Sequence, residues 1–141
     1  MSLILVIEDD PRIQRALRRQ FSAEGYDVHI EGEGPSGLAA CKSLRPVTVV
    51  LDLMLPGLSG RTVCKEIKAW CSDIPVIVLS SLPEKNRQKL IEAGAEEYLE
   101  KGLMTPAPGV NVLPKALENV ICRVNRRRGI AFSSVPIAKE S

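Results

Sequence analysis

Three continuous apolar runs of β-forming residues, each ending at a polar residue, limit this chain to few folds. The runs are 3–7, 47–51 and 76–79. A strand that is apolar on both faces must be covered on both faces, which is typical of a parallel sheet between two layers of helices. The segments between the runs carry apolar residues at helical spacing. The pattern therefore predicts strands and helices in alternation.

The expected helices have recognisable start and stop signals. Asp10 followed by Pro11 predicts an N-cap and a first helical turn, and Gly25 ends that helix. Ser59 is the expected N-cap of the helix after the second long apolar run. The other helices are expected over about 35–44, 84–93 and 113–124, and the shorter strands over about 26–30 and 98–101.

Five strands alternating with five helices predict right-handed crossovers and an open, doubly wound parallel sheet of the α/β class. We expect the flavodoxin-like (βα)5 fold with strand order 2-1-3-4-5. At 141 residues and 15.4 kDa, one domain is expected rather than a two-domain enzyme. In such a sheet the functional crevice lies at the carboxyl ends of the strands.

Polar side chains stand at the carboxyl ends of four expected strands. Glu8 and Asp9 follow the first strand, Asp52 the third, Ser80 the fourth and Lys101 the fifth. Three carboxylates on neighbouring strands repel one another and attract a cation, and oxygen ligands without histidine or thiolate select Mg²⁺. The lysine can pair with an anion at the metal, and the serine can donate a hydrogen bond to it. Each signal is weak alone, but together they indicate phosphoryl chemistry.

The segments that carry these residues resemble the receiver domain of two-component response regulators, as in the single-domain bacterial chemotaxis regulator. The matching segments are 4–11, 50–60, 75–81 and 93–101. The resemblance extends from residue 3 to about 127. It implies a receiver domain over 1–127, followed by a basic, flexible tail over 128–141.

The resemblance also implies a role for each residue of the site. Asp52 is the expected phosphoacceptor, phosphorylated by a sensor histidine kinase, a phosphotransfer protein or a small phosphodonor. Asp9, the Asp52 carboxylate and the main-chain carbonyl of Met54 would bind Mg²⁺ directly, with Glu8 acting through water. Lys101 and the metal would neutralise the phosphoryl group. The domain would then catalyse its own phosphorylation and dephosphorylation without being a conventional turnover enzyme.

Phosphorylation is expected to change the surface of the domain. By the resemblance, Ser80 moves to bind a phosphoryl oxygen and Tyr98 rotates inward behind it. The surface formed by the fourth helix, the fifth strand and the last helix then changes, and a downstream output protein binds there.

The chain departs from the family pattern at two places. Gly102 stands where proline usually follows the lysine, so no cis peptide is expected there, and the segment 102–112 is unusually long. The two positions that flank the phosphoryl group are the apolar Met54 and Leu82. Since neither orients an attacking water by a hydrogen bond, we expect slow autodephosphorylation.

The cysteines and the single histidine do not form a metal-binding pattern. No two cysteines form a C-x-x-C, and His29 alternates with apolar residues in a strand-like run, where it is expected to be on the surface or half-buried. We expect reduced thiols that pack as small apolar side chains. The cysteines are Cys41, Cys64, Cys71 and Cys122.

Charge and hydropathy limit the partners and the location. Residues 112–141 carry six basic and two acidic groups, but this stretch is too short for a DNA-binding output domain, so DNA binding by this chain is not expected. No apolar run approaches the roughly 20 residues of a membrane span, and the N-terminus lacks a cationic leader. We expect a cytoplasmic protein without membrane insertion.

Three alternatives remain. One is a receiver-like interaction module that is not phosphorylated. Another is a hydrolase with an aspartate nucleophile, although such enzymes need a second carboxylate at the position of Met54. A nucleotide-binding protein is disfavoured because no glycine-rich phosphate loop follows the first strand. Side chains of opposite charge could also form reciprocal ion pairs in a weak two-fold homodimer. The candidate residues are Lys85, Arg87, Lys89, Glu96, Glu97 and Arg123.

Overall fold

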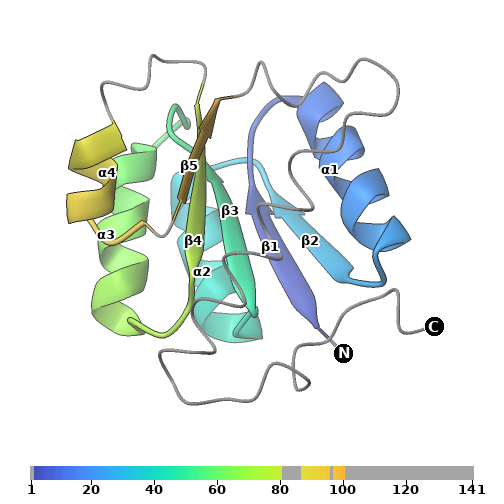
Figure 1. Cartoon of the computed structure of the whole chain (residues 1–141), viewed down its shortest axis with the longest axis horizontal. Coiled ribbons are helices and arrows are strands. Elements are labelled where there is room, and N and C mark those ends of the chain that lie inside the picture. Colours follow the sequence, from blue (N-terminus) through green and yellow to red (C-terminus); the bar gives the residue numbers. More distant parts are fainter. Residues whose placement is uncertain (1, 81–86, 96, 101–141) are drawn as a thin grey trace.

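The computed structural model describes residues 2–80, 87–95 and 97–100, and within them five strands alternate with four helices (Figure 1). The strands form one parallel sheet in the order β2-β1-β3-β4-β5, which confirms the predicted flavodoxin-like topology. The elements are β1 (Leu3–Ile7), α1 (Pro11–Ala23), β2 (Asp27–Glu31), α2 (Gly34–Leu44), β3 (Thr48–Asp52), α3 (Gly60–Trp70), β4 (Val76–Ser80), α4 (Arg87–Glu92) and β5 (Glu97–Glu100).

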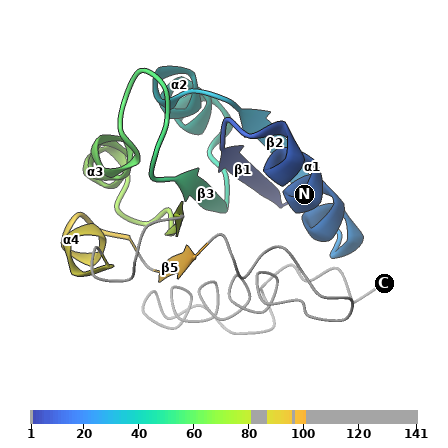
Figure 2. The same cartoon turned by 90° about the horizontal axis from the view of Figure 1, so that it is seen from above.

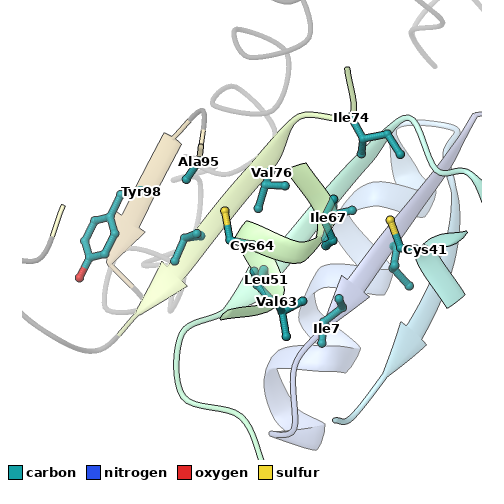
Figure 3. Close-up of a cluster of buried hydrophobic side chains, with 13 residues drawn as sticks. Ile7, Cys41, Leu51, Val63, Cys64, Ile67, Ile74, Val76, Ala95 and Tyr98 are labelled. Carbon is teal, nitrogen blue, oxygen red and sulfur yellow. The ribbon is translucent and has the colours of Figure 1, made fainter. Parts of the chain in front are cut away.

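Helices cover both faces of the sheet, as the fully apolar strands require. Successive residues of a strand point to opposite faces, so each strand contributes to two core layers. Figure 2 shows α1 on one side of the sheet and α2 and α3 on the other. Leu17 and Phe21 of α1 pack in the first layer. In the second layer, Cys41 of α2 and Ile67 of α3 pack against the strands, as Figure 3 shows.

Local chemistry sets the helix starts where the sequence predicts them. Asp10 caps α1, because its carboxylate accepts a hydrogen bond from the Arg12 main-chain N–H at 2.9 Å. Ser59 caps α3 in the same way, accepting from Thr62 N–H at 3.3 Å. These caps hold the two helices at the ends of the strands β1 and β3 that carry the acidic residues.

Two strands lie one residue later than predicted. The β2 strand starts at Asp27 because the main-chain N–H of Tyr26 bonds back to Phe21 O at 3.0 Å and belongs to the end of the helix. The β3 strand includes Asp52, which is paired with Leu79 of β4. Pairing with neighbours, rather than the limits of the apolar run, decides these ends.

Several expectations lie outside the described residues. They concern Lys101, Leu82, Cys122, the segment 102–112, the helix over 113–124, the start of the helix over 84–93, and the tail. In the part of the chain that is described, no helix has the length and apolar character needed to cross a membrane.

Candidate functional site

The carboxyl ends of β1 and β3 bring together three carboxylates: Glu8, Asp9 and Asp52. One side-chain oxygen from each lies within 4.8 Å of those of the other two. Glu8 and Asp52 are buried and Asp9 is exposed. We call these three residues the acidic cluster. The sequence predicts this convergence, because β1 and β3 are neighbours in the expected sheet, as they are in the observed one.

The turn after β1 is held by hydrogen bonds to Glu8. The Glu8 main-chain N–H donates to Glu31 O of β2 at 3.0 Å, and the Asp10 N–H donates to Glu8 Oε2 at 3.0 Å. Gln14 of α1 reaches back, so that its Nε2 donates to the Glu8 main-chain O at 2.5 Å. In the sequence, only the place of Gln14 one helical turn after the Asp10 cap indicates this contact.

Asp52 ends β3 and is held from two sides. The main-chain N–H of Met54 donates to Asp52 Oδ1 at 3.1 Å. Gly60, the first residue of α3, packs closely against the backbone that follows Asp52, and the Gly60 N–H donates to Leu53 O at 2.8 Å. A Cβ on Gly60 would lie 2.6 Å from Leu53 Cα, so only glycine fits this approach. The sequence alone does not indicate this contact.

An open hollow of about 370 Å³ lies beside the acidic cluster. Its described lining is mostly apolar. The residues are Asp9, Leu53, Met54, Leu55, Pro56, Gly57 and Ser59. The Ser59 hydroxyl lies 3.1 Å from the Thr62 hydroxyl. Asp9 therefore supplies the charge on this surface.

The donor set fits a hard divalent cation. All three side chains of the acidic cluster offer carboxylate oxygens, and within the described residues no histidine or cysteine belongs to such a group. Oxygen ligands close to one another favour Mg²⁺ or Ca²⁺ over the transition metals. Two of the carboxylates are buried, so a bound cation would offset both their repulsion and their loss of hydration.

The other predicted site residues lie on β4 and β5. Ser80 is the last residue of β4, directly after the pair formed by Asp52 and Leu79, and its side chain is fully buried. Tyr98 of β5 is 4% exposed and packs in the core layer shared with α2 and α3 (Figure 3). Lys101 follows β5 outside the described residues.

The described thiols and the histidine do not belong to the acidic cluster. Cys41 and Cys64 are buried thiols that form no disulfide, as predicted, while Cys71 is half-buried. Burial raises the pKa of the Cys41 thiol to about 11, which makes it a poor nucleophile. His29 is half-buried on the edge strand β2, and its Nε2 lies 2.6 Å from Glu31 Oε2.

Comparison with known proteins assigns the family. The family model described as the response regulator receiver domain matches residues 4–107. The chain belongs to this family. The response regulator MprA of Mycolicibacterium vanbaalenii is 35% identical to this receiver over 122 residues, which are 86% of the chain and 48% of that protein. The chain thus spans about half the length of the curated relatives it matches.

Two solved receivers are similar in fold. The BeF3-activated N-terminal receiver domain of Klebsiella pneumoniae RstA is 29% identical, with a TM-score of 0.75 over 85% of this chain and 98% of that one. The response regulator TrrA of Thermotoga maritima, in complex with Mg²⁺ and BeF, is 28% identical, with a TM-score of 0.74 over 85% of this chain and 99% of that one. Both support a two-component signalling role for this receiver.

Proposed function

We propose that this receiver takes a phosphoryl group onto Asp52 in a Mg²⁺-dependent reaction. The donor is a phosphohistidine of a sensor histidine kinase or phosphotransfer protein, or a small phosphodonor. The observation that carries the proposal is the acidic cluster, three carboxylates within 4.8 Å at one edge of the sheet. A shared cation would offset the repulsion between these carboxylates. Asp52, one of the two buried members, would be the nucleophile.

The chain positions Asp52 for attack. The Met54 N–H binds Oδ1 and fixes the rotation of the carboxylate. A carboxylate oxygen attacks phosphorus, the bond from phosphorus to the donor nitrogen breaks, and its electron pair leaves with the imidazole. The product is an acyl phosphate on Asp52. Because Asp52 is 1% exposed, the protein shields this carboxylate from most bulk water.

The cation would be held by Asp9, Asp52 and the main-chain carbonyl of Met54, with Glu8 acting through water. When bound, Mg²⁺ neutralises charge on the transferring phosphoryl group. Gln14 positions Glu8 by binding its main-chain carbonyl, so the ligand geometry depends on the first turns of α1. We assign to Lys101 the role of a second positive charge for the phosphoryl group.

The phosphorylated state would be communicated through β4 and β5. Ser80 and Tyr98 are the proposed switch residues, and both start from buried positions. The proposed output surface comprises α4, β5 and the expected helix over 113–124. We further propose a receiver domain over 1–127 with a tail over 128–141, acting in the cytoplasm.

Intact-protein mass spectrometry tests the proposal. The protein is incubated with acetyl phosphate and Mg²⁺, and we expect one phosphoryl adduct. Asp52→Asn and removal of the metal should each abolish the adduct, because the first removes the nucleophile and the second the charge neutralisation. Asp27→Asn is the matched control. This exposed aspartate starts β2, so it lies at the amino ends of the strands, away from the carboxyl ends that carry the acidic cluster.

An adduct that persists in Asp52→Asn would contradict the assignment of the acceptor. If folded, Mg²⁺-bound protein takes no phosphoryl group from acetyl phosphate or from a phosphorylated histidine kinase, the chain is instead an interaction module that is not phosphorylated.

A further inference from the structure

Met54 is the most exposed large apolar side chain among the described residues. The residue is 62% exposed, whereas its main-chain N–H is bound to Asp52 Oδ1 at 3.1 Å. The backbone of this residue is therefore tied to the proposed phosphoacceptor, while most of the residue's surface is open to solvent. A solvent-exposed methionine sulfur is open to two-electron oxidants such as hydrogen peroxide.

Met54 lines the open hollow beside the acidic cluster. Glu8 and Asp52 are buried, and Asp9, the exposed member, lines the hollow together with Met54. A water molecule that hydrolyses an acyl phosphate on Asp52 must enter by such an open side. The lining of the hollow therefore affects how well that water is held.

Few described side chains on this lining can hold the attacking water. Residues 53–57 carry no strong side-chain donor or acceptor, because the Met54 sulfur accepts hydrogen bonds only weakly. The Ser59 hydroxyl is engaged with the Thr62 hydroxyl at 3.1 Å and the Thr62 N–H at 3.3 Å. Asp9 is a ligand of the proposed cation and is therefore not available to hold this water. A new acceptor on residue 54 would therefore change the lining substantially.

We infer that Met54 is a reversible oxidation site that shortens the lifetime of the phosphoryl group on Asp52. The inference rests on the proposed function. In the oxidation, the Met54 sulfur attacks one peroxide oxygen, the O–O bond breaks, a sulfur–oxygen bond forms and water leaves. The sulfur is oxidised by two electrons and the peroxide is reduced. Methionine sulfoxide reductases reverse the change.

The sulfoxide acts on hydrolysis by holding the attacking water. Its oxygen accepts a hydrogen bond from the water, whose own oxygen then attacks phosphorus. The bond from phosphorus to the Asp52 oxygen breaks, and Asp52 leaves as a carboxylate. Inorganic phosphate and one proton are the other products. One such hydrogen bond shortens the half-life about three- to tenfold.

The experiment compares phosphoryl lifetimes before and after oxidation. The full chain is treated with hydrogen peroxide, then with catalase and a dithiol to remove oxidant and restore thiols, and is phosphorylated with acetyl phosphate and Mg²⁺. After removal of the donor, mass spectrometry follows decay of the adduct, and peptide mapping locates the sulfoxide. We expect the half-life of the adduct to be about three- to tenfold shorter in oxidised protein. Treatment with a sulfoxide reductase should restore the original half-life.

Each variant is compared with its own untreated sample. Met54→Leu removes the sulfur and should lose the response to peroxide, whereas Met104→Leu, which removes the sulfur of another methionine, should keep it. Met54→Gln places a polar oxygen at a similar position and should shorten the half-life without oxidant. An unchanged half-life when mapping finds Met54 oxidised would overturn the inference, as would a Met54 that stays reduced. Failure of untreated protein to form any adduct would instead overturn the proposed function, and the inference with it.

Discussion

At the scale of single residues, the site depends on Gly60, where no side chain larger than hydrogen fits. Gly60 packs against the backbone directly after Asp52, and a Cβ there would lie 2.6 Å from Leu53 Cα and 2.9 Å from Leu53 O. We expect Gly60→Ala to lower the free energy of unfolding by about 1–3 kcal/mol, since backbone must move to relieve the overlap. Urea unfolding followed by circular dichroism measures this difference.

Gly32 is the matched control for Gly60. It lies near the same edge of the sheet, and an added Cβ meets only Gln14 Nε2 at 3.9 Å, an ordinary contact. Gly32→Ala should therefore leave the unfolding free energy within about 0.5 kcal/mol of wild type or raise it, because alanine lowers the entropy of the unfolded chain. Equal effects of the two substitutions would show that the close approach of Gly60 does not matter for stability.

At the scale of elements, the packing of α2 on β1 gives a pH-dependent stability. Cys41 of α2 is buried against the sheet, and this burial raises the pKa of its thiol from 9.0 to about 11. The folded thiol keeps its proton where the unfolded thiol loses it. The stabilisation is thus complete below pH 9 and is lost as the pH rises from 9 to about 11.

Denaturant titrations at pH 8, 9, 10 and about 11 measure this loss. We expect wild type to lose more unfolding free energy across this range than Cys41→Ala, which has no thiol to ionise at that position. Cys71, the half-buried thiol at the end of α3, also raises the pKa of Cys41, but less than burial does. Cys71→Ala should therefore retain most of the wild-type slope. Identical slopes for wild type and Cys41→Ala would contradict the assigned shift.

The elements also show why sequence reasoning succeeds in some places and fails in others. Asp10 and Ser59 cap helices through bonds to residues two or three positions away, so the sequence predicts both starts correctly. The start of β2 depends on a bond between Tyr26 and Phe21 that competes with the sheet, and the prediction is one residue early. Local signals predict local bonds, but strand ends depend on tertiary pairing.

The same distinction holds for the site. The convergence of Asp9 and Asp52 follows from strand order, which the alternation of elements predicts. The contacts made by Gln14 and Gly60 depend on how α1 and α3 dock. No spacing or periodicity indicates the contact of Gly60, and only the place of Gln14 one helical turn after Asp10 indicates its own. Topology therefore identifies which residues meet, whereas docking of the helices decides which residues hold them in place.

At the scale of the whole molecule, the acidic cluster links cation binding to stability. Its carboxylates come from β1 and β3, adjacent strands in the middle of the sheet, whose side chains are buried in both core layers. Unfolding separates the strands and destroys the cation site. A cation that binds only the folded state therefore stabilises the entire domain, by about 2.7 kcal/mol at 100 times its dissociation constant.

Thermal unfolding with and without Mg²⁺ tests this linkage. We expect Mg²⁺ to raise the melting temperature of wild type and of Asp27→Asn, because Asp27 lies at the amino ends of the strands and the acidic cluster lies at their carboxyl ends. Asp9→Asn should lose most of the rise, since it removes the exposed ligand of the acidic cluster. In a chelator the same variant should melt at or slightly above wild type, because one charge of a repelling group is gone. A full Mg²⁺ response in Asp9→Asn would mean that the cation binds elsewhere on the molecule, and that the cluster is not its site.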